Sequence, residues 1–157
     1  MNSTKETLGI KGNLNIVLTD AQGNIKDTRK ITNLVVTSGV LFILNRLKDN
    51  VTYSVGMSHM EVGTGSTATA STQTTLAAAL GARQPFSSTL VTNTTASGTI
   101  TYAATFGSGV STGALMEAGI FNASTTGIML CRTVFPVINK GANDTMTITW
   151  AVTITPG

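Results

Sequence analysis

The sequence is poor in the residues on which most catalytic and metal sites depend. Its 157 residues include one cysteine and one histidine, and only 11% of them are charged. The lone Cys131 cannot form an internal disulfide, so the fold must be stabilised by its core or by its partners. One histidine, one cysteine and dispersed carboxylates supply no cluster at a spacing typical of metal ligands. We therefore expect no metal, no other cofactor and no enzymatic activity.

Long apolar runs are missing as well. The longest, residues 40–44, is much shorter than the roughly 20 residues that a membrane-spanning helix needs. Residues 1–12 lack the apolar stretch of a secretory signal. These absences predict a protein that has no membrane partner and is made in a reducing compartment.

Charge of either sign is scarce and scattered. The 10 Lys and Arg residues exceed the 7 Asp and Glu residues, but they form no basic cluster interleaved with aromatic residues. Nucleic acid is therefore not an expected partner. A charged share of 11% is well below the roughly one quarter that is usual in globular proteins. Because a weakly charged surface costs little to desolvate, this composition predicts a subunit of a larger assembly.

What the sequence does contain is a strict two-residue period, clearest near its C-terminus. Large apolar side chains alternate there with threonine, which predicts a strand with one buried face. The apolar positions are Met146, Ile148, Trp150, Val152 and Ile154, and the threonines are Thr145, Thr147, Thr149, Thr153 and Thr155. Trp150 lies on the apolar face and is the expected core anchor. The threonine face is a candidate subunit contact, because threonines can pair across strands at little desolvation cost.

Weaker patterns of the same kind predict the rest of the fold. Further strands are expected at residues 13–19, 25–30, 33–36, 57–62, 100–106, 115–121 and 128–135. A short helix is expected near residues 38–47, where Val40, Ile43, Leu44 and Leu47 share one face, and a helical turn at residues 76–80. About seven or eight strands with one helix indicate an all-β protein, an antiparallel, jelly-roll-like β-sandwich. Residues 13–157 would form this single domain, and residues 1–12 an extended N-terminal arm.

Two features resemble functional motifs but favour a structural explanation. His59 has no obvious nucleophile and carboxylate to complete a triad, so a packing or hydrogen-bonding role is expected. Residues 63–68 (Gly-Thr-Gly-Ser-Thr-Ala) fit the G-x-G-x-x-A pattern of dinucleotide sites. The Ser, Thr and Ala residues that follow form no apolar helix face, and the motif carries weight only inside a βαβ unit. A tight turn is the better interpretation.

Glu117 is a carboxylate in an otherwise apolar strand, at residues 115–121. It could be a general base, but no second carboxylate lies near it in sequence. Arg132 lies on the next expected strand and is equally surrounded by apolar residues. We therefore expect Glu117 and Arg132 to form a structural pair across the two strands.

A set of short motifs, in order, resembles small virion proteins of tailed bacteriophages. The motifs are Asn33-Leu34-Val35-Val36 with Gly39, Met60-Glu61-Val62-Gly63-Thr64-Gly65, Thr75-Leu76, Glu117-Ala118-Gly119-Ile120-Phe121-Asn122, Met129-Leu130-Cys131-Arg132-Thr133-Val134-Phe135, and Asp144 before Ile148-Thr149-Trp150. The resemblance covers residues 13–155. In that pattern a glutamate often lies shortly before the arginine that is Arg83 here, whereas this chain has Ala79-Leu80-Gly81-Ala82. The pattern therefore supplies no partner for a salt bridge of Arg83 in this sequence.

The resemblance implies a structural role on a virion, with two possible placements. One is a capsid decoration, or cement, protein: a homotrimer that binds the major capsid protein on the capsid surface after synthesis in the bacterial cytoplasm. The other is a subunit associated with the tail or its fibres. The short single domain without heptads or collagen-like repeats favours cement. Candidate contacts are the arm at residues 1–12 and the Ser/Thr/Ala segment at residues 66–75. A small hydrolase or cupin-like metal enzyme and a carbohydrate-binding module are the alternatives. Cupins need several histidine ligands and this chain has one, and carbohydrate-binding modules usually display aromatic residues, which make up only 5% of the chain.

Overall fold

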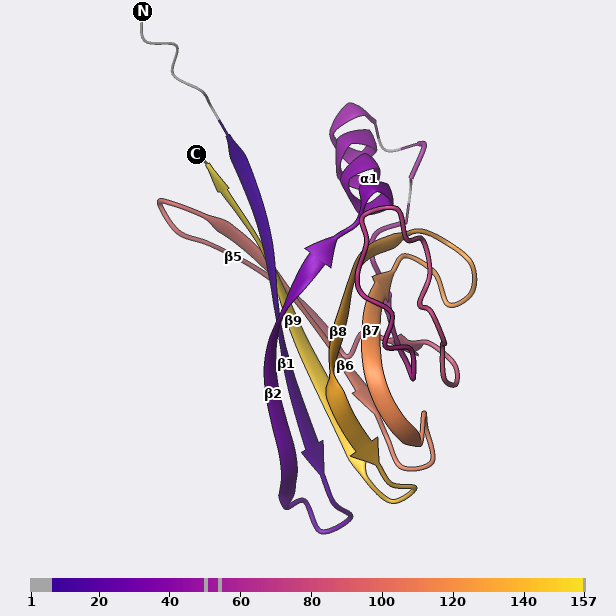
Figure 1. Cartoon of the computed structure of the whole chain (residues 1–157). Helices are drawn as coiled ribbons and strands as arrows, with labels where there is room; N and C mark the ends of the chain where they lie inside the picture. The colour runs from indigo at the N-terminus through magenta and orange to yellow at the C-terminus, as the bar shows by residue number, and fades with distance from the viewer. Residues whose placement is uncertain (1–6, 50, 54, 157) are drawn as a thin grey trace, which may run out of the picture.

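The structure is a computed structural model that describes residues 7–49, 51–53 and 55–156. Within these residues, nine strands form one antiparallel sheet, and a single helix lies at one end of it (Figure 1). The strands are β1 (Leu8–Thr19), β2 (Ile25–Val35), β3 (His59–Gly63), β4 (Gln84–Pro85), β5 (Ser88–Asn93), β6 (Gly98–Phe106), β7 (Gly113–Phe121), β8 (Met129–Lys140) and β9 (Thr145–Pro156), and the helix is α1 (Thr37–Lys48). Their order across the sheet is β4-β3-β7-β8-β2-β1-β9-β6-β5.

The sheet curls because β2 pairs with a different neighbour at each end. Most of β2 follows β1, but its last residues, Leu34 and Val35, pair with Arg132 and Cys131 of β8. This joins an open half (β1, β2, β5, β6 and β9) to a covered half (β3, β4, β7 and β8), names used below. One apolar core draws residues from both halves, so their inner faces pack against each other. The all-β antiparallel class is confirmed in this form, as one curled sheet.

The C-terminal strand has the predicted geometry. In β9 the residues from Met146 to Val152 that face the core are buried, and the threonines between them are partly exposed. Trp150 is completely buried, and its indole Nε1 donates to Oδ1 of Asn33 over 2.9 Å. A buried indole needs such an acceptor. Trp150 therefore connects β9 to the end of β2, where the sheet turns from one half to the other.

Three sequence-based boundaries change. Residues 8–12, assigned to the N-terminal arm, belong to β1 and pair with β9 from Pro156 to Val152, while residues 1–6 of that arm lie outside the described residues. The alternation of residues 14–19 continues into this segment only weakly, which is why the strand was expected to start later. β8 extends to Lys140, beyond the expected end at residue 135. β5 was not expected at all, because its six residues are all exposed and show no buried face.

Helix α1 forms where it was predicted, but its apolar residues point in two directions. Gly39 lies against β8 so closely that a Cβ there would be 2.1 Å from the carbonyl oxygen of Leu130. Phe42 is buried and stacks on Tyr53, with 5.4 Å between ring centroids. Of the four residues that predicted the helix, Val40, Leu44 and Leu47 are exposed, whereas Ile43 is partly buried against the core. Leu41 is exposed as well. We call Val40, Leu41, Leu44 and Leu47 the apolar helix patch. Helix α1, which carries this patch, lies at the end of the molecule away from the β1–β2 turn (Figure 1).

Candidate functional site

Glu117 and Arg132 form the predicted pair, and both are completely buried. Arg132 donates from Nη2 and Nε to Oε2 of Glu117, over 2.7 Å and 2.9 Å. The two residues are diagonal neighbours, because the register of β7 and β8 places Arg132 opposite Gly119. A two-fold donor contact of this kind is among the strongest hydrogen-bonded arrangements available to a carboxylate.

The pair also holds a long segment over the covered half, residues 64–80, here named the capping loop. Oε1 of Glu117 accepts from the N–H groups of Gly65 and Ala78, and Oε2 accepts from that of Ala77, at 2.7–3.0 Å. Arg132 donates to the carbonyl oxygen of Thr67 and, from Nη1, to the side-chain oxygen of Gln73. Both ends of the loop are thereby bound to the pair.

This arrangement decides between the two roles considered for Glu117. Its carboxylate accepts five hydrogen bonds in a completely buried site, which occupies all of the roughly four lone-pair sites of its two oxygens. No oxygen is left to face a substrate, and a buried carboxylate without these partners would be costly. The geometry therefore supports the structural role.

The glycines of the G-x-G-x-x-A match are explained by the same carboxylate. A Cβ on Gly65 would lie 2.3 Å from Oε1 of Glu117, and one on Gly63 would lie 2.7 Å from it. Backbone N–H groups do approach an anion here, as they do in dinucleotide sites, but the anion is a side chain of the same protein. These glycines do not lie in a βαβ unit, as the tight-turn interpretation assumed. That interpretation did not predict their contact with Glu117.

The predicted helical turn at residues 76–80 does not form. The N–H groups of Ala77 and Ala78 donate to Glu117, and that of Leu80 donates to the carbonyl oxygen of Val62. These donors are directed at the sheet and cannot form a helical ladder. Leu76 is buried with Val36, Phe121 and Met129 in a small second core beneath the loop.

Arg83 forms an ion pair, although the family pattern supplied no partner for it in this sequence. Its Nε lies 3.4 Å from Oε2 of Glu61 on β3, so a glutamate distant in sequence takes the place of the missing one. Arg83 also lies over the ring of Phe121, 3.5 Å from its centroid, and donates to the carbonyl oxygens of Ala123 and Thr126. It fixes the loop between β7 and β8. Sequence order alone concealed this partner, because β3 and Arg83 meet only in the folded sheet.

The remaining reactive side chains are not gathered into a site in the described part of the chain. His59 contacts the hydroxyl of its neighbour Ser58 over 2.7 Å from Nδ1. Cys131 is completely buried, and this burial raises the pKa of its thiol. Among the described residues, no three His, Cys, Asp or Glu side chains lie close enough to hold a metal ion.

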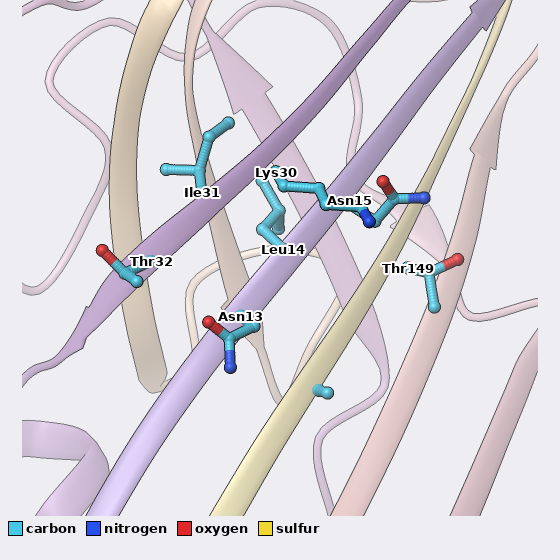
Figure 2. Close-up of a pocket in the computed structure, with 8 residues that line it drawn as sticks. Asn13, Leu14, Asn15, Lys30, Ile31, Thr32 and Thr149 are labelled. Atoms are coloured by element: carbon cyan, nitrogen blue, oxygen red, sulfur yellow. The ribbon is translucent and has the colours of Figure 1, made fainter.

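The outer face of the open half is formed by small polar side chains. A hollow of about 400 Å³ lies there, lined by Asn13, Leu14 and Asn15 of β1, Lys30, Ile31 and Thr32 of β2, and Thr149 and Ala151 of β9. Figure 2 draws these side chains on the three neighbouring strands. Across the same face Thr99 and Thr153 are 2.8 Å apart at their hydroxyls, which confirms the expected cross-strand threonine pairing. No described segment covers this face as the capping loop covers the other half.

The apolar helix patch is the second exposed surface of note. Leu44 and Leu47 are 55% and 79% exposed, and Val51 beyond the helix is 79% exposed. Val40, Leu44 and Leu47 follow one another at intervals of four and three residues within α1, which ends at Lys48. That spacing places them in a stripe on one side of the helix, the form in which helices bind partners. An exposed apolar patch of this kind is a candidate interaction surface.

No protein-family model, no curated protein and no solved structure matches this chain. Among the described residues, no helix is long and apolar enough to cross a membrane.

Proposed function

We propose that this protein is a structural subunit of a tailed-bacteriophage virion, a decoration protein that binds the outer surface of the capsid. Its partner is the major capsid protein, and its task is to stabilise contacts between coat subunits. The placement rests on the resemblance of the sequence motifs. The observation that carries the binding role is the apolar helix patch, which exposes large side chains at one end of the molecule.

The patch suits a stable protein contact. An interface of standard size buries about 800 Å² on each partner and has an apolar centre with a polar rim. The helix supplies such a centre, with Arg46 and Lys48 beside it in its last turn. The helix is held at its first turn, where Ser38 donates to the carbonyl oxygen of Met129 and Gly39 touches Leu130. A helix that is already formed and anchored loses little conformational entropy on binding.

The jelly-roll-like sandwich belongs to the same proposal. Its support is the packing of the open and covered halves around one core, as the two layers of a sandwich pack. Unlike a sandwich of two separate sheets, however, the two halves are joined into one sheet through β2.

The experiment is co-sedimentation of the purified protein with capsid shells that lack it, followed by imaging of the decorated shells. We expect saturable binding to the shell surface. Leu44→Asp and Leu47→Asp together should weaken binding at least about 100-fold, because each places a charge in an apolar interface. Both residues are exposed, so the fold should tolerate the change.

The matched control is Ile25→Asp. Ile25 is 69% exposed, comparable to Leu47, and lies at the β1–β2 turn at the other end of the molecule. It should bind shells as well as the unchanged protein. Equal binding by the helix variant and the control would contradict the proposed surface. Binding of the unchanged protein to tails and not to shells would instead support the tail or fibre placement.

A further inference from the structure

The two edges of the curled sheet are protected very differently. β4, at one edge, has only the two residues Gln84–Pro85, and proline has no N–H to offer a new strand. β5, at the other edge, has six residues, Ser88–Asn93, all of them exposed. An exposed edge strand is a template for pairing with another chain.

None of the usual protective devices is present on β5. Residues 84–116 contain no charged residue, and the β5–β6 register runs without a bulge. The two large apolar side chains of the strand, Leu90 and Val91, are 60% and 70% exposed. Natural proteins place lysine, proline or a bulge on such an edge when it must remain single. Their absence indicates that the edge is occupied in the working form of the protein.

The hairpin geometry identifies the backbone groups that are available. At the turn, the N–H of Thr94 donates to the carbonyl oxygen of Ser97 over 2.8 Å. Antiparallel strands alternate between hydrogen-bonded and non-hydrogen-bonded pairs, so Thr89, Val91 and Asn93 direct their N–H and C=O groups away from β6. In the described part of the chain no other strand pairs with this side of β5.

We propose that β5 pairs with β5 of a second copy of this chain, antiparallel and about a two-fold axis at Val91. Only residues with outward-facing groups can pair with each other, and this register uses all of them: Val91 meets its equivalent, and Thr89 meets Asn93. The strand is uncharged throughout, so a second copy meets it without like-charge repulsion. The inference concerns self-association and does not depend on capsid binding.

A two-fold contact fits the edges better than the three-fold ring that the resemblance implies. A ring needs two different complementary surfaces on each copy, whereas a two-fold contact needs one that is self-complementary. β4 offers a poor second surface, because it is short and contains Pro85. The neighbouring Arg83 is already paired with Glu61.

The first test is sedimentation equilibrium of the full chain from about 1 µM to about 1 mM, a range suited to contacts of moderate affinity. We expect a monomer–dimer equilibrium. Val91→Pro removes the outward N–H but no hydrogen bond to β6, and should raise the dimer Kd at least about tenfold. Val91→Thr keeps the N–H and should leave the Kd within about threefold. Circular dichroism and the melting temperature check that both variants are folded.

The second test traps the contact and does not rely on a proline. In the proposed register the two Val91 Cα atoms are about 5.5 Å apart, within disulfide range. Val91→Cys should therefore give a covalent dimer on mild oxidation, and the native Cys131 will not interfere because it is buried. Val137→Cys, at a position 44% exposed on β8, is the control and should stay monomeric.

Several results would overturn the proposal. A protein that stays monomeric over the whole range would mean that a different partner occupies β5. A trimer, or a dimer that Val91→Pro leaves unchanged, would place the contact elsewhere. If the proline variant fails to fold, oxidation of Val91→Cys no faster than that of Val137→Cys would be decisive against it.

Discussion

The capping loop covers the outer face of the covered half and is hydrogen-bonded to the completely buried Glu117 and Arg132. The outer face of the open half has no such cover among the described residues and presents threonine, asparagine and lysine side chains. In the covered half Glu117 and Arg132 are each bound several times, and every contact depends on the others. In the open half the hydroxyl contacts are single and water can reach them. Substitutions should therefore act strongly on the first face and weakly on the second.

The difference also separates stability from binding. A buried ion pair is expensive to desolvate and is retained where it specifies one arrangement, here the course of the capping loop. A face composed mainly of small neutral groups does little for stability, but it can be covered by another surface at a low desolvation cost. The covered half fixes the shape of the protein, and the open half leaves a face and the β5 edge for contacts.

The largest expected effect comes from breaking the buried pair. Glu117→Gln leaves the Arg132 guanidinium without a counter-charge in a site that is 0% exposed. Removal of one partner of a buried pair costs about 3–5 kcal/mol. We expect the free energy of unfolding, measured by urea denaturation, to fall by about that amount. A loss below about 1 kcal/mol would mean that the pair is not a structural centre.

The control for this prediction replaces both partners. Glu117→Leu with Arg132→Leu removes the charges together and leaves none uncompensated. The double variant should lose less stability than the sum of the two single changes, because the second change removes an unpaired charge. Simple additivity would show that the two side chains act independently.

A smaller effect is expected from the loop side of the contact. Gly65→Ala places a Cβ 2.3 Å from Oε1 of Glu117 and so displaces the Gly65 N–H. Loss of a hydrogen bond to a buried charged group costs about 1–3 kcal/mol. The capping loop should also become more sensitive to limited proteolysis. Gly98→Ala is the matched change in the open half, where nothing lies within 4 Å of the new Cβ, and it should change stability by less than about 1 kcal/mol.

The sequence predicted the parts of this comparison that depend on local pattern. Alternation in residues 145–155 correctly predicted β9 and the burial of Trp150, because a strand has a period of two whatever it pairs with. Charged residues within apolar strands correctly pointed to Glu117 and Arg132, because an unpaired buried charge is rarely tolerated.

The parts that depend on long-range contacts could not be predicted. The partner of Arg83 is Glu61, which lies 22 residues before it in the sequence. The backbone N–H groups that donate to Glu117 belong to residues 65, 77 and 78, which are also far from Glu117 in the sequence. Residues 76–80 have the composition of a helical turn, but the N–H groups of Ala77 and Ala78 are bound by Glu117 and that of Leu80 by Val62. The apolar stripe of α1 predicted the helix correctly and gave no sign that most of it faces outward. Periodicity reports which residues share a face, and not what covers that face.

A still smaller effect is expected on the open face. Thr99→Val and Thr153→Val remove a hydroxyl pair 2.8 Å apart. Cross-strand pairs of this kind contribute about 0.2–1 kcal/mol, so a double-mutant cycle should give a coupling energy in that range. The pair of Thr105 and Thr147, at 3.4 Å, should give a smaller coupling. A coupling energy above about 2 kcal/mol would contradict our expectation that side-chain contacts on the open face contribute much less to stability than those of the covered half.

The smallest effect is expected from the ion pair of the open half, between Lys26 of β2 and Asp144 just before β9. Their atoms are 2.6 Å apart, but Lys26 is 44% exposed, so solvent screens the attraction. The hydrogen bond from Lys26 is the first cause that lowers the pKa of Asp144 below its usual value of 3.8, and the Gly141 N–H adds to it. The contribution of Asp144 to stability is therefore present above pH 3.8 and is lost as the pH falls through its lowered pKa.

Lys26→Met tests this assignment, because it removes the donor and should raise the pKa of Asp144 toward its usual value. The free energy of unfolding, measured from about pH 5 to about pH 2, should then fall less steeply than in the unchanged protein. Part of the acid dependence should persist, because the pKa of Asp49 is lowered by the Thr52 and Val51 N–H groups and does not depend on Lys26. Parallel stability curves for the variant and the unchanged protein would show that the pair of Lys26 and Asp144 contributes nothing to the pH dependence of stability. Of the two ion pairs, only Glu117 and Arg132 in the covered half would then contribute to the free energy of unfolding.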